Sequence, residues 1–117
     1  GLCADVLSVV LAEHRLVLGE KVLGELARVL RQKMKMPEDT VVEADEFLRH
    51  EAVVISGGPE VATPITDPDD VRVLAEAVAG SVDVLVTGDR DLLDVAEALP
   101  IEVLSPRGFW ERLQAPP

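Results

Sequence analysis

Five carboxylates in this 117-residue chain stand where the surrounding pattern predicts a strand end, a helix start or a helix face. Asp67 and Asp70 open a helical pattern, while Asp89 and Asp91 follow an apolar run that is typical of a buried strand. Glu25 lies on a helix face between two leucines, where an apolar residue would be usual. Strand ends and helix starts at one edge of a parallel sheet lie close together, so we expect these acids to share one pocket.

Carboxylates that gather in one pocket repel one another, and this repulsion determines what the pocket must hold. Two like charges about 4 Å apart cost about 4 kcal/mol at an effective dielectric constant near 20, so protons or cations must neutralise the group. Mg²⁺ and Mn²⁺ prefer carboxylate and water oxygens, and a bound ion polarises a phosphate and activates water. The acids therefore predict a Mg²⁺ or Mn²⁺ site that hydrolyses a phosphodiester.

Each acid also has a plain structural interpretation. Asp67 suits the N-cap of the helix after it, with Asp70 at the third helical position as in a capping box. Asp89 and Asp91 suit a turn that leads into a capped helix, and Glu25 suits a solvated helix face. Taken one at a time, the acids favour these interpretations, and only their convergence favours a metal site.

The composition and the motifs that the sequence lacks argue against several other classes of function. The chain has 11 Lys and Arg against 22 Asp and Glu, and its net charge of −11 argues against a broad electrostatic grip on nucleic acid. It has no Gly-x-Ser-x-Gly elbow, no Gly-x-x-x-x-Gly-Lys phosphate loop and no Gly-x-Gly-x-x-Gly fingerprint. Cys3 is the single cysteine, which fits a cytoplasmic protein without disulfides. No apolar run reaches the roughly 20 residues of a membrane span, and no signal peptide is visible.

Apolar spacing predicts a chain in which helices and strands alternate. Strands are expected at 15–18, 52–55, 82–87 and 101–104, and helices at 2–14, 22–30, 38–48, 68–79, 92–96 and 106–113. This alternation indicates a parallel sheet covered on both faces, so the expected fold class is α/β. The connections are short, which indicates one domain over residues 1–117.

Several runs of sequence together resemble one known family. They are Asp67–Ala77, Val84–Leu93 and Ile101–Phe109, and the upstream stretch Leu16–Leu30 fits the same family. The specific feature is an acid-led helix with Val-x-Val-Leu-Ala-x-Ala, paired with Thr-x-Asp-x-Asp after a strand. Over nearly its whole length the chain resembles a PIN domain, in particular the PIN-family toxin components of toxin–antitoxin systems. The resemblance implies a PIN-like, Rossmann-like three-layer α/β/α fold with a central parallel sheet.

The same resemblance assigns roles to individual residues. Glu25, Asp70 and Asp89 match the catalytic acids that hold one or two Mg²⁺ or Mn²⁺ ions, and Asp91 matches a frequent accessory ligand. Thr87 matches a residue that would position Asp89 or a metal-bound water. The family further implies an RNA substrate, a cognate antitoxin protein, a homodimer and no membrane association. We therefore predict a metal-dependent endoribonuclease that is the toxin of a toxin–antitoxin pair.

The chain departs from the family pattern at its start. Family members open with a strand that ends in Asp-Thr-Asn or a similar run, and the helix expected from Leu2 matches the family's first helix, which comes after that strand. Asp5 lies on this helix and does not replace the missing acid, whereas Asp67 and Asp69 stay open as further ligands. We expect a sheet without its N-terminal strand, and weak or no metal binding by this chain alone.

Two competing functions stay open at this point. The absent first acid and the charge of −11 also suit a non-catalytic PIN-like module that binds a protein partner, with Phe109 and Trp110 at its interface. A receiver-like or phosphatase-like α/β domain would need a nucleophilic Asp at the end of an early strand, and the sequence has none. Metal binding discriminates the nuclease from the interaction module.

Overall fold

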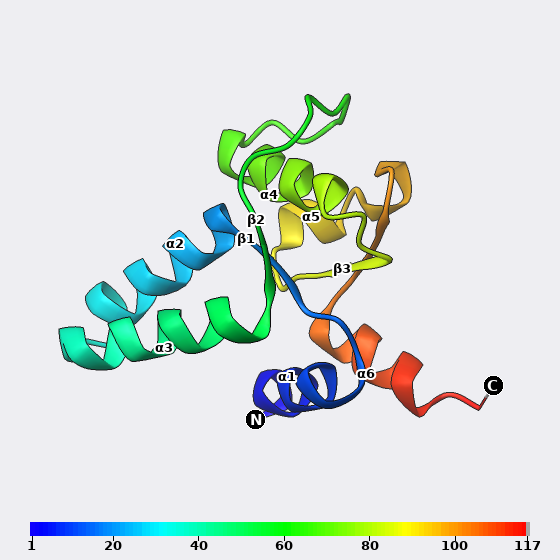
Figure 1. Cartoon of the computed structure of the whole chain (residues 1–117). Helices are drawn as coiled ribbons and strands as arrows, with labels where there is room; N and C mark the ends of the chain where they lie inside the picture. The colour runs from blue at the N-terminus through cyan, green and yellow to red at the C-terminus, as the bar shows by residue number, and fades with distance from the viewer. Residues whose placement is uncertain (117) are drawn as a thin grey trace.

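The computed structural model describes residues 1–116, in which helices and strands alternate except over residues 20–51, where two α-helices follow one another, as the sequence predicts (Figure 1). The strands are β1 (Val17–Gly19), β2 (Val53–Ile55), β3 (Val84–Val86) and β4 (Glu102–Leu104). The α-helices are α1 (Leu2–Glu13), α2 (Glu20–Arg28), α3 (Glu38–Glu51), α4 (Pro68–Ala79), α5 (Arg90–Leu93) and α6 (Pro106–Gln114). A π-helical turn, η1 (Val29–Lys33), extends α2, and a 3₁₀ turn, η2 (Ala96–Ala98), precedes β4.

The strands form two separate parallel pairs, not the single central sheet expected from the sequence. β1 pairs with β2 in the register Val17↔Val53, and β3 pairs with β4 in the register Val84↔Glu102. Within residues 1–116, no strand joins β1 to β3. Each strand is only three residues long and has a partner on one edge alone. The α/β character is confirmed, and the continuous sheet is corrected to two pairs.

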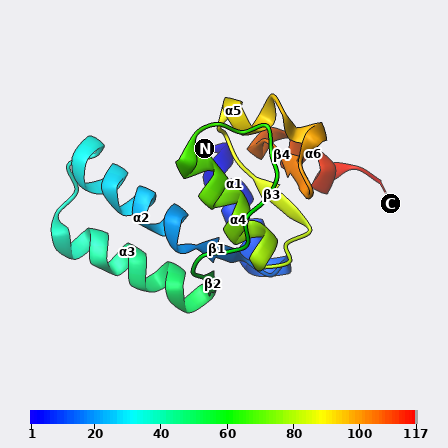
Figure 2. The ribbon, with the colours of Figure 1, turned by 90° about the horizontal axis from the view of Figure 1, so that it is seen from above.

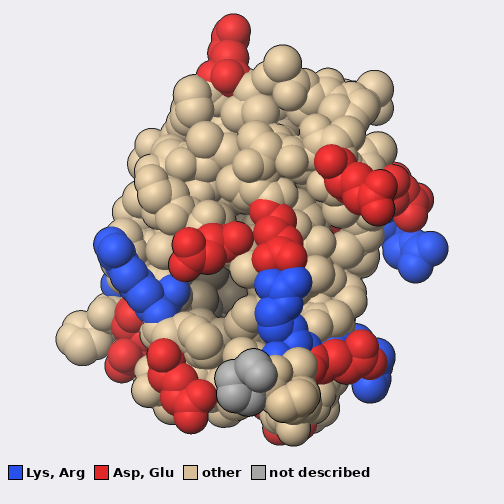
Figure 3. Space-filling view, turned by 90° about the vertical axis from the view of Figure 1, so that its right-hand side faces the viewer, with Lys and Arg blue, Asp and Glu red and all other residues tan. Residues whose placement is uncertain are grey.

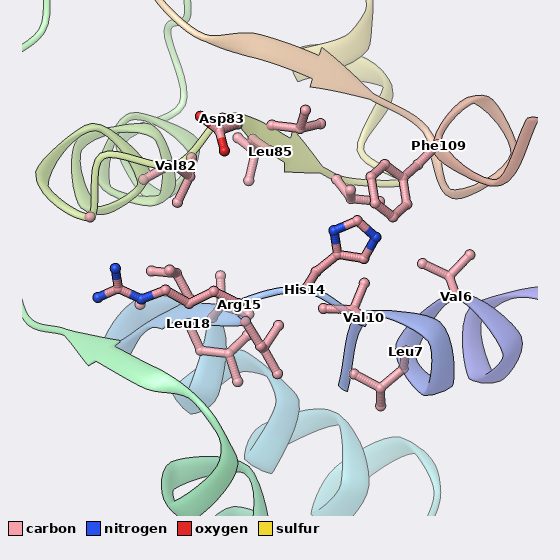
Figure 4. Close-up of a pocket in the computed structure, with 18 of the residues that line it drawn as sticks. Val6, Leu7, Val10, His14, Arg15, Leu18, Val82, Asp83, Leu85 and Phe109 are labelled. Carbon is pink, nitrogen blue, oxygen red and sulfur yellow. The ribbon is translucent and has the colours of Figure 1, made fainter. Parts of the chain in front are cut away.

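A groove of about 680 Å³ lies between the two pairs. All residues of β1 and β3 line it, together with side chains of α1 and α6. Leu18 and Leu85 approach the groove from opposite sides, as do Val10 and Phe109 (Figure 4). Because β2 and β4 each occupy only one edge of their partner strand, the remaining edges of β1 and β3 border this groove.

Helix α4 forms the centre of the core. Leu74 is completely buried on it, and its small neighbours Ala75 and Ala77 are buried as well. Seen from above, α4 crosses the middle of the molecule, while α2 and α3 lie side by side and project as an arm (Figure 2). α4 packs against α2 and against both strands of the β1/β2 pair, so its first turn is held in a fixed place relative to α2.

A buried glutamate on α4 ties three segments together. Glu76 is only 6% exposed. Its Oε1 accepts a hydrogen bond of 2.9 Å from the backbone nitrogen of Lys21, and its Oε2 accepts one of 2.8 Å from that of Gly57. A Cβ atom on Gly19 would lie 2.3 Å from Oε1 of Glu76, so this close approach requires glycine. Glu76 therefore positions the start of α2 against α4.

We expect Glu76→Gln to lower the free energy of unfolding by about 1–3 kcal/mol, measured by urea denaturation. The amide offers one acceptor oxygen where the carboxylate offers two, so one buried N–H loses its partner. Glu97→Gln makes the same change at an exposed position of η2 and should leave stability unchanged. Equal effects of the two substitutions would contradict the role given to Glu76.

Candidate metal centre

Three aspartates come together at the starts of two helices. Asp70 lies in the first turn of α4, Asp89 is the N-cap of α5, and Asp91 lies in the first turn of α5. One carboxylate oxygen of each lies within 4.8 Å of those of the other two. The structure thus brings together three of the four acids that the sequence analysis named as metal ligands.

Hydrogen bonds at the helix starts hold these acids in place. Asp67 caps α4 by accepting from the backbone nitrogen of Asp69 at 2.8 Å, and Asp89 caps α5 by accepting from that of Asp91 at 2.9 Å. The hydroxyl oxygen of Thr87 accepts from the backbone nitrogen of Asp89 at 3.1 Å. The structural interpretation of Asp67 as an N-cap is therefore confirmed, and of the two acids in the expected turn, Asp89 is the one that caps α5. The capping hydrogen bond uses Oδ1 of Asp89. The second oxygen of the carboxylate can still bind a cation, so an N-cap role and a ligand role are compatible.

Asp70 is a buried carboxylate that lacks a partner for one of its oxygens. The residue is 8% exposed, and its Oδ2 has no hydrogen bond within the described part of the chain. Burial raises the pKa of Asp70 to about 6, with further contributions from a hydrogen bond and the charge of Asp89 and from the charges of Asp67 and Asp91. A divalent cation that binds Oδ2 would satisfy this oxygen and would neutralise the repulsion among the three carboxylates. Three carboxylates are the oxygen donors that Mg²⁺ and Mn²⁺ prefer, so the residues fit such an ion.

The raised pKa predicts how the stability of the metal-free protein depends on pH. The folded pKa of Asp70, about 6, exceeds the ordinary value of 3.8, so the folded state binds this proton more tightly than the unfolded chain does. The contribution of the Asp70 proton to the free energy of unfolding is fully present below about pH 4, and it is lost as the pH rises through about 6. We expect this contribution to be on the order of 1–3 kcal/mol, and to appear as a pH-dependent difference between wild type and Asp70→Asn in urea denaturation with EDTA. A difference that stays constant from about pH 4 to pH 8 would contradict it.

Glu25, the fourth predicted ligand, lies outside this group. Its Oε1 is 3.7 Å from Nζ of Lys21, which also contacts Oδ1 of Asp69 at 2.9 Å. Lys21 thereby links α2 to the first turn of α4, immediately before Asp70 in the chain. The solvated-helix interpretation of Glu25 underestimated this contact, since its side chain belongs to an ion-paired cluster that borders the metal centre.

A family model for the PIN domain matches residues 3–91 of the chain. The chain belongs to the PIN domain family. The matched span contains Glu25, Asp70, Asp89 and Asp91, so the acids named from the sequence all lie inside the PIN domain match. PIN domains are typically nucleases, and PIN nucleases generally use divalent metal ions, in agreement with the aspartate cluster. No curated protein matches the chain.

Two residues important for this PIN domain's site were missed from the sequence. Lys21 had a weak signal, because it stands four residues before Glu25 on a helix, a spacing that favours an ion pair. Glu76 had none, because its two backbone donors come from distant segments of the chain. Residues 1–116 contain no helix whose length and apolar character would suit a membrane span.

Proposed function

We propose that this PIN domain is an endoribonuclease that hydrolyses RNA phosphodiesters with Mg²⁺ or Mn²⁺. The observation that carries the proposal is the group of Asp70, Asp89 and Asp91, in which a buried oxygen of Asp70 has no hydrogen-bond partner within residues 1–116. Buried carboxylate oxygens usually have such a partner, so an unsatisfied one beside two other acids supports a cation ligand. Family membership supports the nuclease chemistry.

The chain's own residues would divide the work at this centre. Asp70 and Asp89 would hold the ion, with Asp91 as the accessory ligand, and Thr87 would keep the backbone of Asp89 in place through its 3.1 Å hydrogen bond. When bound, the ion polarises the phosphate and lowers the pKa of a water molecule. Glu25 would act as an outer ligand, because Lys21 holds it beside the first turn of α4.

We also propose that the groove between the two strand pairs accepts a further parallel strand. Such a strand would join the pairs into one central sheet and give the three-layer α/β/α arrangement. The free edges of β1 and β3 support this, because another backbone can satisfy both rows of N–H and C=O groups at once. The largely apolar lining suits a strand that is buried on both faces. An acid at its carboxyl end would complete the ligand set that the resemblance implies.

A toxin role, with a cognate antitoxin and a homodimer as protein partners, belongs to the same proposal. The motif resemblance supports it, and so does apolar surface on the arm formed by α2 and α3. Leu26, Val42 and Phe47 are 37%, 41% and 51% exposed there. Exposed large apolar side chains on a projecting arm suit a surface that binds another protein. The same surface supports the alternative, a non-catalytic PIN-like interaction module.

Incubation of the full polypeptide with single-stranded RNA discriminates these two functions. The nuclease is expected to cut the RNA internally with Mn²⁺ or Mg²⁺ and to leave it intact in EDTA. The interaction module would leave the RNA intact under every condition and would bind no Mn²⁺ in calorimetry. Cleavage that persists in EDTA would sink the metal-dependent mechanism.

A further inference from the structure

A second recess, of about 290 Å³, lies between α2 and α4. Its residues come from α2 and α4: Glu20, Lys21, Gly24, Glu25, Arg28 and Arg72. Lys21 connects it to the metal centre, because its Nζ is 2.9 Å from Oδ1 of Asp69, the residue before Asp70. The recess therefore borders the first turn of α4, the turn that also carries Asp70.

The acids around the recess already have cationic partners. The two carboxylate oxygens of Glu20 accept hydrogen bonds of 2.6 and 2.9 Å from two nitrogen atoms of the Arg49 guanidinium group. Lys21 contacts both Asp69 and Glu25. Each of these acids therefore has a cationic partner other than Arg28 and Arg72, and Glu25 and Asp69 share the single charge of Lys21.

Arg28 and Arg72 are the uncommitted cations of the recess. Neither forms an ion pair within the part of the chain that the structure describes. Both line the same recess, Arg28 from the end of α2 and Arg72 from α4. Three basic residues (Lys21, Arg28 and Arg72) and two acidic residues (Glu20 and Glu25) line the recess, so its lining has a surplus of positive charge.

This surplus is unusual for a chain with a net charge of −11. Three other arginines, Arg31, Arg49 and Arg112, each bind a carboxylate through two nitrogen atoms. Basic side chains elsewhere are interspersed with acidic ones, as the face in Figure 3 shows. Arg28 and Arg72 differ from these three arginines, because they line one recess together and, within residues 1–116, neither holds a carboxylate.

We propose that Arg28 and Arg72 form a subsite for a backbone phosphate of the RNA, next to the phosphate at the metal centre. The inference rests on the proposed ribonuclease function and names how an acidic protein holds its substrate. Guanidinium groups bind phosphate oxygens through two parallel hydrogen bonds. Because Arg28 and Arg72 have no carboxylate to release, phosphate binding breaks no ion pair. Phosphate contacts position a strand without reading its bases, so the subsite sets register and not sequence preference.

Gly24 keeps the recess open. A Cβ atom at this position would meet no other atom within 4 Å. The residue lies inside α2, where glycine is disfavoured, and no neighbouring group requires its small size. A longer side chain at position 24 would project into the space where we place the phosphate.

Binding of a fluorescein-labelled single-stranded oligouridine in EDTA, measured by fluorescence anisotropy, tests the subsite without cleavage. Arg28→Gln and Arg72→Gln are each expected to weaken binding by about tenfold at low salt. Each should also reduce the slope of log affinity against log salt by about 0.7, the value for one phosphate contact on a single strand. Lys33→Gln removes one charge from exposed, unpaired Lys33 in η1 and should leave affinity within about twofold.

A second pair of variants separates charge from shape. Gly24→Glu and Gly24→Gln place side chains of equal size in the recess, and the glutamate is expected to weaken binding further because it repels phosphate. Equal losses in Lys33→Gln and Arg72→Gln, unchanged binding in both arginine variants, or no binding of RNA by wild type would each overturn the subsite. Weakened binding in the arginine variants without Mn²⁺-dependent cleavage by wild type would support the subsite and reject the ribonuclease. Cleavage that depends on Asp89 but not on either arginine would support the ribonuclease and reject the subsite.

Discussion

Replacing Asp89 by Asn in the full polypeptide is expected to lower Mn²⁺-dependent cleavage of single-stranded RNA by at least about 100-fold. The amide oxygen can still cap α5 by accepting from the backbone nitrogen of Asp91, a bond of 2.9 Å, because Asn caps helices as well as Asp does. The charge that would hold the cation is lost, however. The initial rate of cleavage of an end-labelled RNA at saturating Mn²⁺ measures the effect.

The matched control is Asp39→Asn. Asp39 lies exposed in the first turn of α3, and its Oδ1 accepts from the backbone nitrogen of Thr40 at 2.9 Å. The two substitutions make the same chemical change near a helix start, but only Asp89 belongs to the aspartate cluster. Cleavage by Asp39→Asn should match wild type, and an Asp89→Asn protein that keeps full activity would remove Asp89 from the site.

Asp70→Asn is expected to change stability in opposite directions without and with metal. In EDTA at about pH 8, the variant lacks a buried charge whose pKa is raised to about 6, so its free energy of unfolding should rise by on the order of 1–3 kcal/mol. With Mn²⁺ the wild type gains stability by about 1.4 kcal/mol for each tenfold excess of metal over the dissociation constant, while the variant gains little. Thermal denaturation with and without Mn²⁺ measures both effects.

The contrast between the two conditions makes this prediction specific. A residue with a purely structural role would be expected to destabilise the protein when it is changed, whatever the metal content. Asp70→Asn that is less stable than wild type in EDTA, or that responds to Mn²⁺ as strongly as wild type, would contradict the assignment of Asp70 as a ligand.

The aspartate cluster could be predicted because its determinants are local. Asp89 and Asp91 follow an apolar run directly, and Asp70 stands one turn into a helix that Pro68 opens, so strand and helix patterns alone place them at element ends. The topology of parallel α/β chains then brings such ends together. The same local signals predicted the N-cap role of Asp67 and a capped helix after the turn at Asp89 and Asp91, and the structure confirms both.

The remaining features depend on contacts between distant segments, which periodicity does not encode. Glu25 is an acid on the helix where a ligand was expected, and its ion pair with Lys21 lies within α2. The link from Lys21 to Asp69 arises only when α2 packs on α4. Strand patterns predicted four strands, yet they do not say which edges find partners. The separation into two pairs therefore required the structure, as did the buried Glu76 that joins α4 to two backbone nitrogen atoms.

The most direct test of the metal centre is an anomalous diffraction measurement on crystals of the full polypeptide soaked in Mn²⁺. The aspartate cluster predicts a manganese peak coordinated by carboxylate oxygens of Asp70 and Asp89, with Asp91 close to the ion. A map in which manganese lies at other acids while these three carboxylates stay bare would contradict the metal centre and, with it, the nuclease proposal.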